Sequence, residues 1–152
     1  MNELNCFPVQ TPAPILTDRH KALAVRRITK AMRVLLDSVS SGDPIVSELE
    51  GWLIAAKRLK IEVVETDLPE GNIGRLFHEN SIDQWVIQQA HGLDSRMKIR
   101  VVVHEIAHWM LRQMSSEWLC DEREVVYYYD GPVDDQRHLL ARKIENRILK
   151  RS

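Results

Sequence analysis

Three residues in one short stretch have the types and the spacing of a hydrolytic metal site. The stretch His104-Glu105-Ile106-Ala107-His108 has the pattern H-E-x-x-H. On a helix its two histidines lie one turn apart on one face, with about 5–6 Å between their Cβ atoms, so both imidazoles can bind one tetrahedral Zn²⁺. Glu105 would reach a metal-bound water without binding the metal, which suits a general base. The pattern therefore predicts a zinc site with the chemistry of peptide hydrolysis.

The third zinc ligand is not marked by the pattern. A catalytic zinc usually has three protein ligands and one open position. The last predicted helix carries His138 and Glu145, which are seven residues apart and therefore share a face. His138 would complete a three-imidazole site and is the ligand that we expect. Glu145 is the alternative third ligand, which would give two histidines and one carboxylate, and Glu122 and Glu124 stay open behind it.

Peptide hydrolysis also needs a hydrogen-bond donor for the tetrahedral oxyanion, besides the metal. The candidate donors are the phenols of Tyr127, Tyr128 and Tyr129 and the imidazoles of His78 and His91. Residues of these types more often pack in a core or lie on the surface, so the sequence selects none of them.

The elements that must position these residues follow from hydrophobic periodicity. A motif helix is expected over about 96–114, because Ile99, Val103, Ile106 and Met110 recur at helical spacing. Asp94 or Ser95 is expected to cap its N-terminus. A final helix is expected over about 132–149, where it can pack against the motif helix and close the site.

The remaining segments predict two earlier helices and a small sheet. The helices are expected over about 18–40 and from the Asp43-Pro44 pair onward, with Asp43 as N-cap and Pro44 in the first helical position. Alternation and β-branched residues favour strands. Strands are expected at 61–66, 75–78 and 85–87, with a turn region at 67–74 and an irregular N-terminal arm at 1–16. The segment 122–129 could be a strand or a short helix, and we expect it to be irregular or helical. We therefore expect one α+β domain over 1–152, with several helices on a three-stranded, mainly antiparallel sheet.

Composition limits the classes of function. The chain has 152 residues, 44% hydrophobic and 28% charged, as in an ordinary soluble domain. The net charge of −1 gives no general reason to expect direct nucleic-acid or membrane binding. Basic residues gather in the first predicted helix and at the C-terminus, and the simplest interpretation is a solvated helix face. Two cysteines, no visible signal peptide and no apolar run of about 18–20 residues predict a cytoplasmic protein.

The segment RMKIRVVVHEIAHWML resembles the motif helix of the ImmA/IrrE family of small metallopeptidases. The order of elements over roughly 43–149 is also similar to that family. The resemblance implies a compact zincin-like domain, with His104 and His108 as zinc ligands and Glu105 as the catalytic base. Many members lie in phage or mobile-element genomes or beside DNA-binding repressors, which they cleave or antagonise, so the implied substrate is a transcriptional regulator.

The chain departs from the family at the third ligand. Members typically have a Glu that opens a pattern like E-x-x-A-(N/D)-x-F-A, and matching its first Ala to Ala141 puts His138 in the place of that Glu. Two functions therefore compete: a zinc-dependent endopeptidase, and a non-catalytic zincin-like protein that sequesters a partner. A purely structural metal domain is a third interpretation, and nucleic-acid binding has the least support.

Overall fold

The computed structural model describes residues 17–42, 47–114, 126–129 and 136–150. The predicted N-terminal arm, 1–16, therefore lies outside the described residues. The elements are α1 (Asp18–Gly42), α2 (Glu48–Arg58), β1 (Ile61–Thr66), β2 (Asn72–Glu79), a short 3-10 helix η1 (Asn80–Ile82), β3 (Gln84–Ala90), α3 (Ser95–Met114), β4 (Val126–Tyr129) and α4 (Gln136–Leu149). The α+β class is confirmed. No helix among these residues is both long and apolar enough to cross a membrane.

The first two helices begin at local caps. The hydroxyl of Thr17 accepts a hydrogen bond from the backbone N–H of His20, at 3.1 Å, at the start of α1. At the start of α2, Ser47 and Glu50 form a reciprocal capping box, in which each side chain accepts from the other's backbone N–H. The described helix therefore begins at Glu48, whereas the cap expected at Asp43 falls in 43–46, outside the described residues.

The sheet contains the three expected strands and one more. Its strand order is β1-β3-β2-β4. The β2–β3 and β2–β4 pairs are antiparallel, as expected, but β1 and β3 are parallel. Two local expectations are corrected: β2 begins at Asn72, inside the segment expected to be a turn, and Val126–Tyr129 form a strand rather than irregular or helical structure. Both corrections arise from pairing between β2 and β4, which are distant in sequence.

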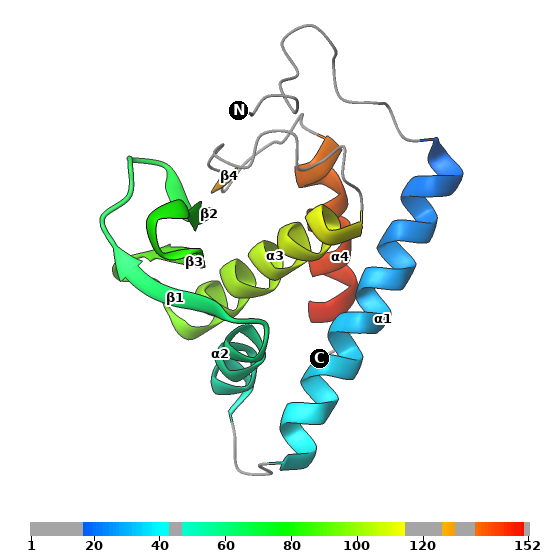
Figure 1. Ribbon diagram of the computed structural model, residues 1–152, viewed down its shortest axis with the longest axis horizontal. Helices are drawn as coiled ribbons and strands as arrows, with labels where there is room; N and C mark the ends of the chain where they lie inside the picture. The colour runs from blue at the N-terminus through cyan, green and yellow to red at the C-terminus, as the bar shows by residue number, and fades with distance from the viewer. Residues whose placement is uncertain (1–16, 43–46, 115–125, 130–135, 151–152) are drawn as a thin grey trace, which may run out of the picture.

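The motif helix α3 lies in the middle of the molecule. Figure 1 shows it between the sheet on one side and α1 and α4 on the other, and α3 contacts α4, α2, α1 and β2. The buried hydrophobic cluster includes residues from all four helices and from β1, β2 and β3. This central position explains why every residue from Val101 to His108 is buried.

Strand β2 touches α3 directly at a glycine. A Cβ atom at Gly74 would collide with Cγ1 of Val101 and would lie 3.2 Å from the carbonyl oxygen of Gln88. We expect Gly74→Ala to lower the free energy of unfolding by about 1–3 kcal/mol, because the core must shift to admit the methyl group. Urea denaturation measures this loss. In the double variant Gly74→Ala/Val101→Ala the obstructing methyls are gone, so its loss should be smaller than the sum of the two single losses; a fully additive result would contradict the collision.

Candidate metal centre

Helix α3 places the three motif residues, His104, Glu105 and His108, on its buried side. The carboxylate of Asp94 accepts a hydrogen bond from the backbone N–H of Met97 at 2.9 Å, which caps the helix as the sequence predicted. His104 and Glu105 are fully buried and His108 is 2% exposed. The two imidazoles are 4.8 Å apart between ring centroids, in a T-shaped arrangement. The spacing of the motif therefore produces the expected shared face.

Helix α4 brings a third imidazole to this pair. Leu140, Ala141, Ile144 and Ile148 are buried, so α4 packs its apolar stripe into the core beside α3. His138 lies on the first turns of α4, half-buried, with its Nδ1 3.0 Å from Nε2 of His108. The candidate ligand atoms of His104, His108 and His138 all lie within 4.8 Å of one another. The three histidines therefore form a cluster that could bind a metal ion.

The dimensions of this cluster fit a small divalent ion after a modest adjustment. Tetrahedral nitrogen ligands at about 2.0–2.1 Å from Zn²⁺ are about 3.3 Å from one another. The nitrogens of His108 and His138 are already 3.0 Å apart, and the widest pair, within 4.8 Å, would have to approach by about 1.5 Å. Small side-chain rotations can supply this movement.

Glu145, the alternative third ligand, occupies a different place. Its Oε1 lies 3.0 Å from Nδ1 of His104, and its Oε2 accepts a hydrogen bond from Nε of Arg100 at 2.7 Å. A carboxylate paired with arginine can only accept, so Nδ1 of His104 carries the hydrogen and donates it to Glu145. Nε2 of His104 then presents its lone pair for a metal. Glu145 thus lies behind His104 and fixes the orientation of its imidazole, as a carboxylate does behind a histidine that binds a metal.

The electrostatic surroundings keep His104 in the form that a metal needs. Burial holds the pKa of His104 well below its usual value, and the nearby charges of His138, Arg142 and Arg100 lower it further. The imidazole is therefore neutral near pH 7. Neutral imidazole is the metal-binding form of histidine.

Glu105 is the least satisfied group of the centre. Its side chain is fully buried, and neither carboxylate oxygen has a hydrogen-bond partner among the described residues. Burial raises the pKa of this carboxyl well above its usual value, and the charge of Glu145 raises it further. A buried carboxyl without a partner costs several kcal/mol of stability. A buried carboxyl with a strongly raised pKa, next to His104 in the sequence, is more typical of a functional site than of a structural one.

The other candidates are not brought into this centre by the described structure. His78 binds Asn80 and Asp83 in the β2–β3 connection, and His91 lies beside Glu65 and Asp67 at the sheet edge. Glu122 and Glu124 fall outside the described residues. Tyr127, Tyr128 and Tyr129 belong to β4, but only their backbone is described.

Arg100 is the residue of the centre that the sequence argument missed. It lies one helical turn before His104 on α3, where an i, i+4 neighbour can share the same carboxylate partner. The four-residue spacing of Arg100 and His104 is visible in the sequence, but it points to a role for Arg100 only when the position of Glu145 is known.

Comparisons with known proteins identify no relative of this chain, so the description of the centre rests on its geometry. No family model matches this sequence, and no curated protein shows significant similarity to it. The centre is therefore defined by three clustered imidazoles, one buried carboxylate without a partner in the described chain, and the Arg100–Glu145 pair behind His104.

Proposed function

We propose that this chain is a zinc-dependent endopeptidase that acts on a protein substrate. One observation carries the proposal: the ligand atoms of three histidines lie within 4.8 Å of one another, and Glu105, the residue next to His104, is buried without a hydrogen-bond partner among the described residues. The three histidines could hold a metal ion. We assign Glu105 the role of base rather than of ligand, because it is not part of the histidine cluster. This division of roles is that of H-E-x-x-H hydrolases.

Zinc is the metal that suits this donor set best. His104, His108 and His138 offer three neutral imidazoles and leave one position open, which is the ligand number of catalytic zinc sites. When bound, zinc would supply a Lewis acid that polarises the scissile carbonyl and lowers the pKa of water.

The chain's own residues would divide the remaining work. Glu105 takes a proton from the attacking water and later gives it to the leaving amine. Glu145 holds the hydrogen of His104 on Nδ1 and so fixes the orientation of that imidazole. Arg100 pairs with Glu145 at 2.7 Å and so holds that carboxylate in position against His104. Each role follows from the donor and acceptor atoms that face one another.

The substrate class comes from the resemblance to ImmA/IrrE metallopeptidases. The resemblance rests on the motif segment and on the order of a helix, strands, the motif helix and a last helix; the chain has this order, with β4 added between α3 and α4. We therefore propose a DNA-binding transcriptional regulator of a phage or mobile element as the substrate.

A non-catalytic binding protein is the second candidate, and one observation favours it. Glu105 and His104 are fully buried and His108 is 2% exposed, so a peptide reaches the carboxylate only if neighbouring groups move. A protein that keeps this metal centre and sequesters a partner needs no such access.

Metal removal tests the proposal against a purely structural metal. The full chain, loaded with zinc, is incubated with a proteome-derived peptide library, and mass spectrometry records the new termini. We expect a chelator to stop cleavage, and added zinc to restore it, while circular dichroism shows that the helices persist. Unfolding on chelation would instead indicate a structural metal. Zinc binding without cleavage of any peptide would favour the binding protein, and no metal at saturating zinc would contradict both.

A further inference from the structure

A hollow with a basic lining lies on the far side of the helical layer from the sheet. It has a volume of about 390 Å³ and is formed by α1 and the end of α4. Small-molecule sites in proteins have volumes of roughly 300–1,000 Å³, so this hollow has the size of a ligand site. None of the proposed metal ligands lines it, so what it binds is independent of the metal centre.

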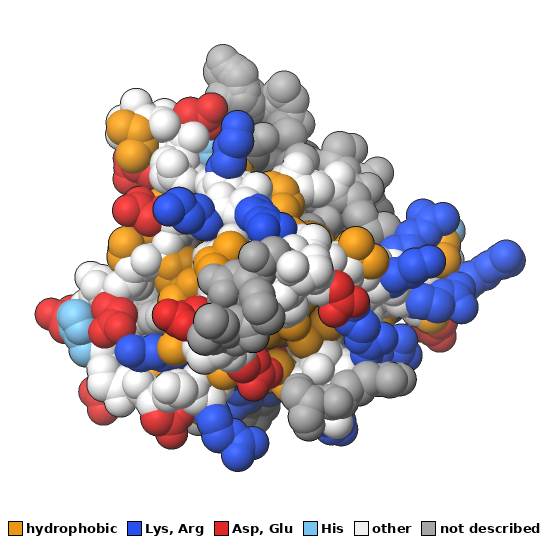
Figure 2. Space-filling model, turned by 90° about the horizontal axis from the view of Figure 1, so that it is seen from below, with side chains coloured by type: hydrophobic (Ala, Val, Ile, Leu, Met, Phe, Trp, Pro, Cys, Tyr) orange, Lys and Arg blue, Asp and Glu red, His pale blue; other side chains and the backbone are white. Residues whose placement is uncertain are grey.

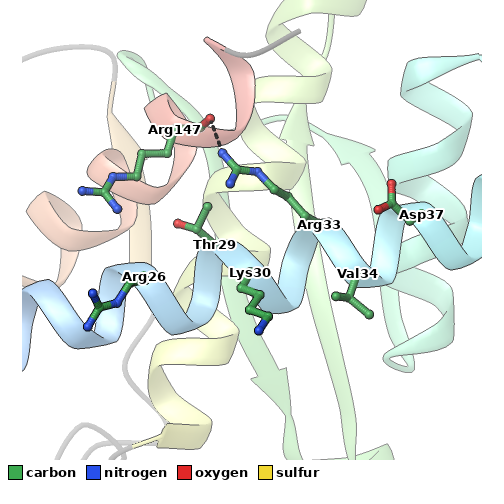
Figure 3. A pocket seen from close by; sticks show the side chains of 7 residues that line it. All are labelled: Arg26, Thr29, Lys30, Arg33, Val34, Asp37 and Arg147. Carbon is green, nitrogen blue, oxygen red and sulfur yellow. Dashed lines mark hydrogen bonds between the residues drawn. The ribbon is translucent and has the colours of Figure 1, made fainter.

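The lining of this hollow is strongly cationic. Arg26, Lys30, Arg33 and Arg147 line it, and Asp37 is the one acid among the described residues that do so. Figure 3 shows the guanidinium groups of Arg26 and Arg147 reaching toward the same end of the hollow, with Asp37 at the other end. Cations held so close together repel one another, and a bound anion would relieve that repulsion.

One of these arginines is held in place by the fold. Nη2 of Arg33 donates a hydrogen bond to the backbone carbonyl of Arg147 at 3.1 Å, so its side chain bridges from α1 to the end of α4. A guanidinium has five N–H donors in a fixed plane, and this bond uses one nitrogen. The bridge thus presents a pre-oriented cation at the wall of the hollow, at little further entropic cost.

A buried hydroxyl lies in the wall of the hollow. Thr29 is 3% exposed, and its Oγ1 has no hydrogen-bond partner among the described residues. Its side chain rises from α1 toward α4, between Arg26 and Arg33 (Figure 3). A helical threonine usually satisfies its hydroxyl on a backbone carbonyl of the preceding turn. An anion in the hollow would give this hydroxyl an acceptor after a small rotation.

The charge distribution favours a small anion over a long polyanion. Figure 2 shows one group of Lys and Arg side chains at the right of the view, while elsewhere on this face Lys and Arg side chains alternate with Asp and Glu. The basic row continues into an adjoining hollow of about 190 Å³, which shares Arg147 and adds Lys21, Lys143 and Asp18. The whole chain nevertheless has a net charge of −1, so a long nucleic acid would also meet acidic surface beyond the two hollows.

We propose that the hollow between α1 and α4 binds the phosphate group of a small ligand. Arg26 and Arg147 provide the charge-assisted hydrogen bonds, Arg33 provides a fixed cation, and the hydroxyl of Thr29 donates to a phosphate oxygen. Arginine is the residue best matched to phosphate, because its planar donors can form two parallel bonds to one phosphate group. The basic residues of α1 thus have a binding role, instead of forming only a solvated helix face.

The test measures phosphate binding to the full chain by isothermal titration calorimetry, with inorganic phosphate and adenosine monophosphate as probes. We expect saturable binding that sodium chloride of equal ionic strength does not reproduce. Arg26→Gln/Arg147→Gln should weaken it by about ten-fold or more. The matched control is Arg27→Gln/Arg96→Gln, which removes the same charge from two exposed arginines outside the hollow and should leave binding unchanged.

A second variant separates a ligand site from a packing defect. Thr29→Val keeps the shape but removes the hydroxyl, so the ligand-free protein should unfold about 2–4 °C higher. Phosphate binding should at the same time weaken several-fold. A higher unfolding midpoint with unchanged phosphate affinity would contradict the site. Equal phosphate binding by the two double variants would also contradict the site, because the phosphate would then bind elsewhere, for example to a metal ion. Binding of a 20-base-pair DNA duplex without binding of either small probe would contradict it as well.

Discussion

Glu105→Gln should reduce peptide cleavage by about 10²–10⁴-fold while the protein binds as much zinc as before, because a general base contributes rate enhancements of that size. The amide has the shape of the carboxylate but cannot take up a proton. Glu105 is fully buried, with no hydrogen-bond partner among the described residues, so the substitution breaks no structural bond that they make. Initial cleavage rates and zinc content of the same preparation measure the two effects together.

The control for this variant is Glu62→Gln, which makes the same chemical change at an exposed position of β1. It should leave both cleavage and zinc content unchanged. Three results of Glu105→Gln are distinguishable. Lost cleavage with retained zinc supports the peptidase. Unchanged cleavage would contradict Glu105 as the general base, and loss of zinc would show that Glu105 is itself a ligand.

The helical part of the fold could be predicted because helix formation is local. The apolar residues from Ile99 to Met110 recur at helical spacing, and they do lie on α3. The cap at Asp94 was also readable, since a single aspartate satisfies the N–H of Met97 three residues later. These signals depend on residues within one or two turns of each other, which one sequence contains in full.

The sheet was predicted less completely because its pairings are not local. The parallel pairing of β1 with β3, and the addition of β4 to β2, join segments separated by a whole element or more. Valine and tyrosine at 126–129 have strand propensity, but a four-residue strand is stabilised mainly by its partner. Gly74 likewise reads as a turn residue until the close approach of Val101 shows why a side chain is absent there.

In the candidate centre, too, local features could be predicted from the sequence and contacts between helices could not. The spacing of His104 and His108 is a local property of α3, and the structure brings them together as predicted. His138 and Glu145 share a face of α4, so the sequence could bring both toward α3 but could not assign their roles. The contacts of Glu145 with Arg100 and with Nδ1 of His104 are the basis on which we propose His138, rather than Glu145, as the third ligand.

His138→Ala and Glu145→Gln should therefore lower zinc affinity to different extents. His138→Ala removes one of three ligands, and we expect it to abolish stoichiometric zinc binding at micromolar protein. Glu145→Gln removes the partner of a ligand, an effect that is typically a 10–100-fold loss of affinity. Competition with a chromogenic chelator measures both affinities. A larger loss for Glu145→Gln than for His138→Ala would make Glu145 the third ligand.

A rescue variant makes this assignment independent of folding defects. His138→Glu offers a carboxylate oxygen from the same turn of α4, and carboxylates are normal third ligands beside two histidines. It should restore stoichiometric zinc that His138→Ala has lost. If Glu145 were the third ligand instead, His138→Ala would keep stoichiometric zinc and His138→Glu would have nothing to restore.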